Sequence, residues 1–276
     1  MDELEMNIES KPLISVILPV NKNDGYFNQA VLSILEQSYS NLELIIIANN
    51  CNDDLWSVIL ALEKKDSRIR PYRLNMGGLV FSLNFGIEMS NGTYIARMDA
   101  DDICLKTRLE EQMDYFLSYP KVDVLGTQIK YIDENSNIID FKPSLLPTEA
   151  SDLLNTSYHK CPLYHPTVMF KKDKISSLGG YKYAFYGEDY ELWNRCFQND
   201  IIINNLDRAL LLYRVHSNQS SQNNTKKNKY VSLVLILSII ATGKYKYLLG
   251  FFVQFNFVQY FIRKTSSIRQ NIRNKQ

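Results

Sequence analysis

The stretch that decides the fold is Tyr94-Ile95-Ala96-Arg97-Met98-Asp99-Ala100-Asp101-Asp102, in which a short apolar run ends in three carboxylates. The apolar part predicts a buried strand, and alternate side chains of a strand point to the same face. If the strand continues, Asp99 and Asp101 therefore face the same way and Asp102 turns aside.

Three neighbouring carboxylates repel one another unless a positive charge lies among them. Mg²⁺ or Mn²⁺ would supply that charge, because both ions prefer oxygen ligands. The same residues could instead form a plain acidic turn, with Asp99 as the cap of a helix that begins near Leu105. The stretch by itself leaves both interpretations open.

Strands and helices alternate along the chain before this stretch. Apolar runs predict strands at 14–20, 42–48 and 70–74, and apolar residues at helical spacing predict helices at 26–35, 55–62 and 79–87. This alternation predicts right-handed βαβ units and an α/β domain, whose open, mostly parallel sheet is flanked by helices. The 276 residues suffice for one such domain with an appendage.

Polar or glycine-containing segments follow each predicted strand. They are Pro19-Val20-Asn21, Ala48-Asn49-Asn50, Asn75-Met76-Gly77-Gly78 and Asp99-Ala100-Asp101. Ligands of such sheets bind beyond the carboxyl ends of the strands, so we expect these segments to meet at one cleft. The two glycines would let an anion approach a helix N-terminus, although a plain loop is the simpler interpretation. No G-x-G-x-x-G follows the first strand and no P-loop motif occurs, which excludes the usual dinucleotide and P-loop sites.

The second half of the chain has a different pattern. It predicts a helix at 109–117, a hairpin of strands 122–131 and 138–141 around the turn 133–137, and a short strand at 165–170. A further helix begins at Glu188, so Glu188 and Asp189 fall in its first turn, where the helix dipole favours ionised carboxylates. They could simply suit the dipole, or serve as a general base. His216 ends the strand that begins at Ala209, and it is either structural or a partner of the carboxylates in a metal site.

The C-terminal fifth is basic, while the rest of the chain is acidic. Residues 222–276 contain ten Lys or Arg and no Asp or Glu, which leaves residues 1–221 with a formal charge of −9 (21 basic minus 30 acidic residues). The apolar runs 230–241 and 248–262 are too short to span a membrane. We expect them to lie at the surface of an anionic membrane leaflet, or else to pack on the domain or on a second subunit.

Composition also excludes several classes of protein. The four cysteines form no C-x-x-C pair, which disfavours a disulfide framework or a zinc site. The acidic start, Met1–Glu5, lacks the apolar core of a secretory signal, so we expect a cytoplasmic location. Nucleic acid is a poor partner for an acidic body without a base-stacking module.

Taken together, four motifs resemble family 2 glycosyltransferases of the GT-A fold. The first strand with Ser33–Tyr39 is similar to the opening of that family, and Gly92–Asp102 looks like its D-x-D segment. Glu188–Trp193 looks like its E-D segment, and Tyr213–His216 resembles its closing strand. The resemblance covers Pro12 to Ser221, and the order and spacing of the motifs make it specific for the family but not for a substrate.

The resemblance implies a nucleotide-sugar donor, a divalent metal and inversion at the anomeric carbon. By this analogy Asp101 binds the metal, Asp99 touches the metal or the ribose, and His216 steadies the metal or the leaving diphosphate. Asp189 takes the proton of the acceptor hydroxyl, with Glu188 as the second candidate. The donor-binding residues would be Pro19, Val20, Asn21, Asn49, Asn75, Gly78, Arg97, Asp99 and Ala100, and the acceptor-side residues His165, Tyr186 and Trp193.

One departure from the family concerns the second strand. The family commonly has two aspartates there, whereas this chain has Ala48-Asn49-Asn50-Cys51. An asparagine side chain both donates and accepts hydrogen bonds, so Asn49 could still bind a uracil edge. The same change could instead indicate a degenerate donor site.

The sequence therefore predicts an N-terminal extension (1–11), a GT-A domain (12–221, with a nucleotide-binding half 12–104 and an acceptor-binding half 105–221) and a basic, apolar helical tail (222–276). We expect an inverting, metal-dependent hexosyltransferase that uses Mn²⁺ or Mg²⁺ and a UDP-sugar. Its acceptor would be a saccharide or lipid-linked saccharide of surface polysaccharide synthesis, at the inner face of the cell membrane. The alternative is a non-catalytic scaffold subunit of a synthase complex, and the chain could also form a homo-oligomer.

Overall fold

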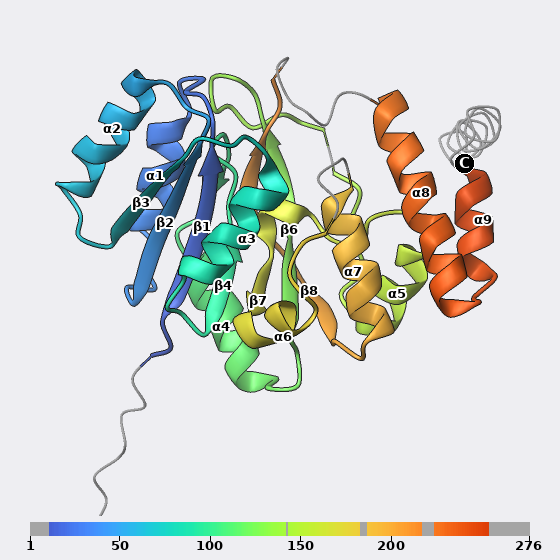
Figure 1. The fold of residues 1–276 in the computed structure, drawn as a ribbon. Coiled ribbons are helices and arrows are strands. Elements are labelled where there is room, and N and C mark those ends of the chain that lie inside the picture. The colour runs from blue at the N-terminus through green and yellow to red at the C-terminus, as the bar shows by residue number, and fades with distance from the viewer. Residues whose placement is uncertain (1–10, 142, 183–186, 217–223, 254–276) are drawn as a thin grey trace, which may run out of the picture.

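A computed structural model describes residues 11–141, 143–182, 187–216 and 224–253, and within them the strands form one mixed, mostly parallel sheet (Figure 1). The strands are β1 (Ile14–Val20), β2 (Leu42–Asn49), β3 (Ile69–Leu74), β4 (Tyr94–Arg97), β5 (Ile103–Cys104), β6 (Val124–Ile132), β7 (Met169–Lys171) and β8 (Ile203–Arg214). Their order is β3-β2-β1-β4-β7-β6-β8-β5. β1 to β4 pair in parallel, as do β6 and β8, whereas β7 runs antiparallel to β4 and β6, and β5 to β8.

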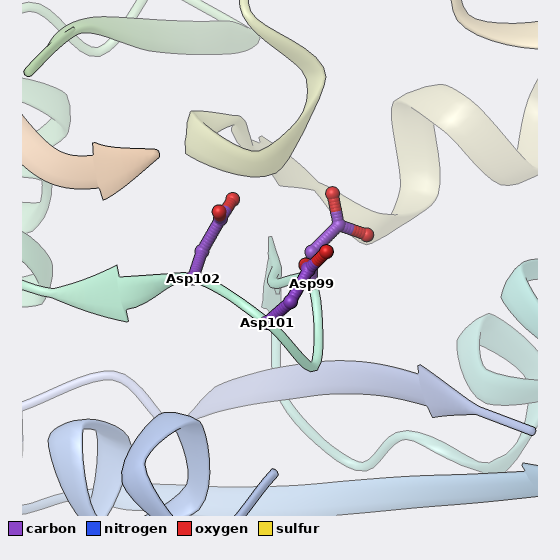
Figure 2. Close-up of side chains that lie close together, drawn as sticks. All are labelled: Asp99, Asp101 and Asp102. Atoms are coloured by element: carbon purple, nitrogen blue, oxygen red, sulfur yellow. The ribbon is translucent and has the colours of Figure 1, made fainter. Parts of the chain in front are cut away.

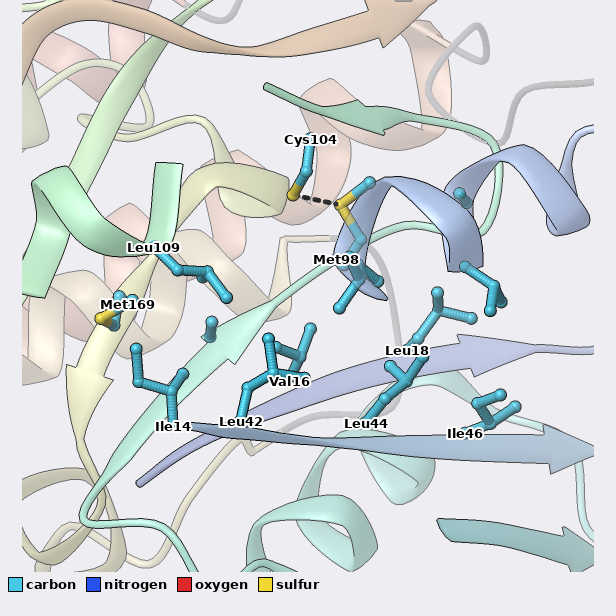
Figure 3. Close-up of a cluster of buried hydrophobic side chains, with 14 of the residues drawn as sticks. Ile14, Val16, Leu18, Leu42, Leu44, Ile46, Met98, Cys104, Leu109 and Met169 are labelled. Atoms are coloured by element: carbon cyan, nitrogen blue, oxygen red, sulfur yellow. Dashed lines mark hydrogen bonds between the residues drawn. The ribbon is translucent and has the colours of Figure 1, made fainter. Parts of the chain in front are cut away.

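Helices cover both faces of this sheet. The helices are α1 (Phe27–Leu35), α2 (Asp53–Glu63), α3 (Leu79–Met89), α4 (Arg108–Ser118), α5 (Ala150–Ser157), α6 (Lys172–Ser177), α7 (Glu188–Gln198), α8 (Asn224–Thr242) and α9 (Lys246–Val253). One core joins α1, α2 and α4 to the face that carries Leu18 (Figure 3), and a second joins α3, α6 and α7 to the face that carries Ile17. Every residue of β1 and β2 is buried, because helices pack on both sides of these strands.

A charged residue inside buried β2 is held by neighbouring segments. The Glu43 carboxylate accepts hydrogen bonds from the Ser15 hydroxyl of β1 at 2.6 Å and from the Asn91 N–H before β4 at 2.6 Å, and it pairs with Arg70 of β3. Burial would raise the pKa of Glu43, but these hydrogen bonds and the charge of Arg70 outweigh it and lower that pKa. The carboxylate thus links three parallel strands at the edge opposite the carboxyl ends.

Three local expectations from the sequence are wrong. β4 ends at Arg97, so the carboxylates lie on a turn, and α4 begins at Arg108 after Thr107, so Asp99 caps no helix. Residues 165–167 form a 3₁₀ turn ahead of β7, because Pro166 has no N–H to give to a sheet. The hairpin turn 133–137 is present, since the Asp133 carboxylate accepts from its own turn, but the return strand is reduced to a single bridge between Ile132 and Ile138.

The first part of the C-terminal tail packs on the domain. Val234 and Leu235 of α8 and Tyr247 of α9 form a buried cluster with Tyr158 and with Tyr190 of α7. Of the helices that the structure describes, none combines the length and the apolar character needed to cross a bilayer. The alternative that the tail packs on the domain therefore holds for α8 and α9. The rest of the tail and the N-terminal extension up to residue 10 lie outside the described residues.

Candidate functional site

A large cavity lies at the carboxyl ends of the strands. Its volume is about 1230 Å³, above the roughly 300–1,000 Å³ of ordinary small-molecule sites. Among the expected residues, it is lined by Pro19, Val20, Asn21, Asn49, Gly78, Arg97, Asp99, Ala100, Asp101, His165, Glu188, Asp189 and His216. Each of the four segments predicted to converge lines the cavity with at least one residue, although the second does so only through Asn49 and the third only through Gly78. Asn75 is exposed and does not line the cavity.

The turn after β4 brings three carboxylates together (Figure 2). Oxygen atoms of Asp99, Asp101 and Asp102 all lie within 4.8 Å of one another. The Arg97 guanidinium donates to Asp99 at 2.5 Å, and Nε2 of His216 lies 3.0 Å from Oδ2 of Asp101. Asp102 was expected to turn aside from this cluster, but the chain bends directly after β4 and Asp102 joins it.

The donor atoms of this turn fit a divalent cation. Oδ1 of Asp102 accepts from the Arg214 N–H at 2.9 Å, but its buried Oδ2 has no hydrogen-bond partner among the described residues. Burial, followed by the charges of Asp99 and Asp101, raises the pKa of Asp102 well above its ordinary value. A bound cation would give the orphaned oxygen a partner and offset the repulsion, and oxygen ligands suit Mg²⁺ and Mn²⁺.

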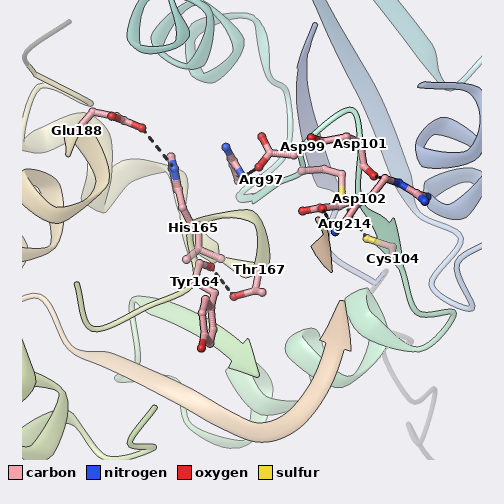
Figure 4. A network of polar contacts seen from close by, with 12 residues as sticks. Arg97, Asp99, Asp101, Asp102, Cys104, Tyr164, His165, Thr167, Glu188 and Arg214 are labelled. Atoms are coloured by element: carbon pink, nitrogen blue, oxygen red, sulfur yellow. Dashed lines mark hydrogen bonds and ion pairs between the residues drawn. The ribbon is translucent and has the colours of Figure 1, made fainter. Parts of the chain in front are cut away.

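Arg214, which the sequence analysis did not single out, holds this turn in place (Figure 4). Its fully buried guanidinium donates to the Asp101 carbonyl at 2.8 Å and to the Asp133 carbonyl at 2.9 Å, and it also donates to the Gln29 side chain at 2.8 Å. It lies 4.2 Å from the centre of the Tyr26 ring. Arg214 thus joins the acidic turn, α1 and the turn after β6. An arginine inside an apolar strand, two residues before His216, was the available signal.

The second pair of carboxylates enters the cavity from the start of α7. Gly187 takes a left-handed conformation (φ 88°) that turns the chain into the helix. The Tyr190 N–H donates to Oδ1 of Asp189 at 2.7 Å, and the Cys161 thiol donates to Oδ2 at 3.4 Å. Burial, followed by the charge of Asp189, raises the pKa of Glu188 to about 7. The proximity of Asp189 contributes to the raised pKa of Asp99 as well, after burial and Asp101, so the two acidic groups share one electrostatic environment.

His165 lies between the two acidic groups. Its Nδ1 is 3.8 Å from Glu188, and its Nε2 is 2.9 Å from the Tyr181 hydroxyl. Burial, together with the positive charge of Arg97, lowers the pKa of His165 well below its ordinary value, so the ring is neutral at neutral pH. The contact with Glu188 is therefore not a pair of opposite charges.

Of the two other expected acceptor-side residues, one does not line the cavity and the other lies outside the described residues. Trp193 is fully buried and packs in the core on the α7 face, because helical spacing identifies an apolar face but not its neighbour. Its ring lies edge-on to the ring of His165, with 6.2 Å between the ring centres. Tyr186 lies outside the described residues. Tyr131, Tyr164 and Val231 also line the cavity, and no motif of the sequence had indicated this.

Two of the residues expected on the donor side are buried polar side chains. Asn49 is buried, and its amide donates to the Val20 carbonyl at 3.4 Å. The Arg97 side chain is likewise buried, and its Nε has no hydrogen-bond partner among the described residues. Both side chains lie at the carboxyl edge of the sheet, where a ligand could meet them.

Comparisons with known proteins agree with this arrangement. The family described as "Glycosyl transferase family 2" matches residues 15–179. The chain is 38% identical over 222 residues to the O-antigen biosynthesis glycosyltransferase WbnJ of Escherichia coli, covering 79% of this chain and 85% of that protein.

Two solved structures share the fold. S. aureus TarS 1–349 in complex with UDP-GlcNAc has a TM-score of 0.68 at 16% identity, with coverage of 87% of this chain and 72% of that one. Mannosyltransferase PcManGT from Pyrobaculum calidifontis, in complex with GDP-Man and Mn²⁺, has a TM-score of 0.66 at 13% identity. The match covers 84% of this chain and 65% of that one. These likenesses confirm the GT-A type of sheet, and from the family match and its relative it follows that the chain belongs to glycosyl transferase family 2.

Proposed function

We propose that the protein transfers a sugar from a nucleotide-diphosphate sugar, a UDP-sugar, to a saccharide or lipid-linked saccharide, with inversion at the anomeric carbon. The relative WbnJ acts in O-antigen biosynthesis, which supports a role in the synthesis of a surface polysaccharide. The observation that carries the proposal is that the acidic turn and the Glu188–Asp189 pair line the same cavity. That cavity is large enough to hold a donor and an acceptor together.

The two acidic groups would divide the chemistry between them. Asp99, Asp101 and Asp102, with His216 beside Asp101, would hold Mn²⁺ or Mg²⁺, and such an ion would offset the negative charge that develops on the leaving diphosphate. Arg97 keeps the Asp99 carboxylate in place through its hydrogen bond. The solved structure of PcManGT with GDP-Man and Mn²⁺ supports a metal, on a fold of the same type.

The second acidic pair, Glu188 and Asp189, would supply the base that accepts the proton of the acceptor hydroxyl. The Asp189 carboxylate would accept the proton of the acceptor hydroxyl while that oxygen forms its bond to the anomeric carbon and the bond to the diphosphate breaks. One displacement of this kind inverts the centre. Glu188 is the second candidate for the base, but its carboxylate is turned toward His165 (Figure 4).

A donor panel tests this function most simply. Purified protein is incubated with UDP-, GDP- and TDP-sugars and Mn²⁺, and release of the nucleoside diphosphate is measured. We expect release from a UDP-sugar in the wild type, and its loss in both the Asp101→Asn and the Asp189→Asn variants. Turnover that survives in either variant, with native circular dichroism, would refute the role given to that residue.

A non-catalytic scaffold is the second candidate, and one feature favours it. Asn49 stands where the family commonly carries an acid, and its amide already bonds the Val20 carbonyl. A scaffold with a degenerate donor site would show no Mn²⁺-dependent thermal protection by any nucleoside diphosphate, whereas the enzyme should be protected by UDP.

A further inference from the structure

Helices α8 and α9 carry apolar side chains on two sides. The inner side packs on α7 and on the segment after α5, through Val234, Leu235 and Tyr247. Further apolar side chains are exposed, namely Leu233, Ile236 and Ile240 of α8 and Leu248 and Leu249 of α9, and we call these five residues the outer face. Ile240 and Leu249 are the most exposed of these, at 75% and 65%.

Such a surface normally marks an interaction site. A helix that is apolar all round is usually buried, and exposed apolar patches on soluble domains mark places where something docks. Leu233, Ile236 and Ile240 follow the spacing of one helical side, and α9 lies beside α8 (Figure 1). On α8 the outer face is therefore one side of the helix rather than scattered apolar residues.

The charge of this region decides between two possible partners, a second copy of the chain and a lipid surface. Residues 222–276, which include both helices, contain ten Lys or Arg and no Asp or Glu. Two copies that met through this region would bring like charges together, which is unfavourable. An anionic lipid surface attracts such a segment. The remaining body, with its formal charge of −9 over residues 1–221, is repelled by the same surface, so the tail would turn toward the lipid.

We propose that the outer face of α8 and α9 docks on the surface of an anionic lipid bilayer. Val231 of α8 lines the same cavity as Asp189, so docking through α8 would hold the cleft close to the bilayer. If the proposed transfer is right, the acceptor of this enzyme is then a saccharide carried by a lipid of that bilayer. This last step rests on the proposed function, whereas the docking itself does not.

Vesicle flotation of the full chain tests the docking. The probes are vesicles of phosphatidylcholine with phosphatidylglycerol and vesicles of phosphatidylcholine alone. We expect the wild type to float with the anionic vesicles and to be released by high salt, because exposed charges are screened. The double variant Ile240→Asp with Leu249→Asp should partition at least about tenfold more weakly, since it places two charges where apolar groups meet lipid.

A matched control separates this effect from general surface changes. Leu117 of α4 is also a well exposed apolar residue (58%), and Leu117→Asp should float as the wild type does. The proposal is overturned if the wild type does not float, if the double variant floats equally well, or if light scattering finds a dimer that the double variant dissociates. Release of UDP from the donor should be the same in the wild type and the double variant. Flotation without any turnover of nucleotide sugars would overturn the proposed function alone, and turnover without flotation would overturn the docking alone.

Discussion

Replacing Arg214 by methionine should loosen the acidic turn and weaken the binding of a divalent cation. The guanidinium donates to the carbonyls of Asp101 and Asp133 and to the side chains of Gln29 and Ser136, at distances from 2.8 to 3.0 Å. A hydrogen bond from a charged group contributes about 1.5–3 kcal/mol. Such contributions are not additive, and breaking a buried charged network costs about 3–5 kcal/mol, which is the loss of unfolding free energy that we expect.

The affinity for the cation should respond to this substitution more specifically than the stability of the fold. Calorimetric titration with Mn²⁺ in the presence of UDP should show affinity lowered by about tenfold or more for Arg214→Met, because Asp101 loses the anchor of its backbone. The control is Arg195→Met. Arg195 is a partly buried arginine, which pairs with Glu191 and donates to the carbonyls of Leu178 and Gly180, away from the turn.

Arg195→Met should therefore lower stability and leave the affinity for Mn²⁺ within about twofold of the wild type. Arg214→Lys keeps the positive charge but lacks the planar guanidinium group. It should therefore bind Mn²⁺ more tightly than Arg214→Met but more weakly than the wild type. If Arg214→Met and Arg195→Met lower the affinity equally, or if Arg214→Met binds Mn²⁺ as the wild type does, Arg214 does not position the turn.

Further predictions concern pH and stability. The pKa of Glu43 is lowered in the folded protein, so its contribution to stability is present above its ordinary pKa of 4.5 and is lost as the pH falls through and below that value. In urea unfolding, Glu43→Gln should therefore be least stable relative to the wild type above about pH 5, and the difference should shrink toward pH 3. The pKa of Glu188 is raised to about 7, so the wild type loses stability as the pH rises from 4.5 through 7. The free energy of unfolding of Glu188→Gln should therefore exceed that of the wild type by up to about 3 kcal/mol at pH 8, but by little at pH 4. A difference that is independent of pH in either variant would show that the carboxylate does not titrate as described. Thermal unfolding should also shift upward on addition of Mn²⁺ with UDP, and this shift should vanish in Asp102→Asn, while an unchanged shift would place the ion away from Asp102.

The central half of the sheet could be predicted from the sequence because its signals are local. β1 and β2 are almost continuously apolar, which is typical of strands buried on both faces, and their ends gave the position of the cleft. α7 was predicted from apolar spacing together with two acids in its first turn, and it begins at Glu188 as expected.

The missed features depend on contacts between distant segments. Arg214 is buried because it meets carbonyls and side chains that lie 78 to 185 positions away in the chain, which no local pattern reports. Asp102 joins the acidic turn because β4 ends at Arg97, and a pattern of alternating residues cannot locate that end. Trp193 has the spacing of an apolar face, but only the packing of α7 on the sheet decides that this face turns away from the cavity.

The most direct measurement is the position of manganese in a crystal soaked with UDP and Mn²⁺, located by its anomalous scattering. We predict one strong peak among the carboxylates of Asp99, Asp101 and Asp102, with the diphosphate bound to it and the Asp189 carboxylate facing the same space. A peak elsewhere, no peak at saturating Mn²⁺, or an Asp189 side chain that faces a different cavity would contradict a metal-assisted transfer at this site.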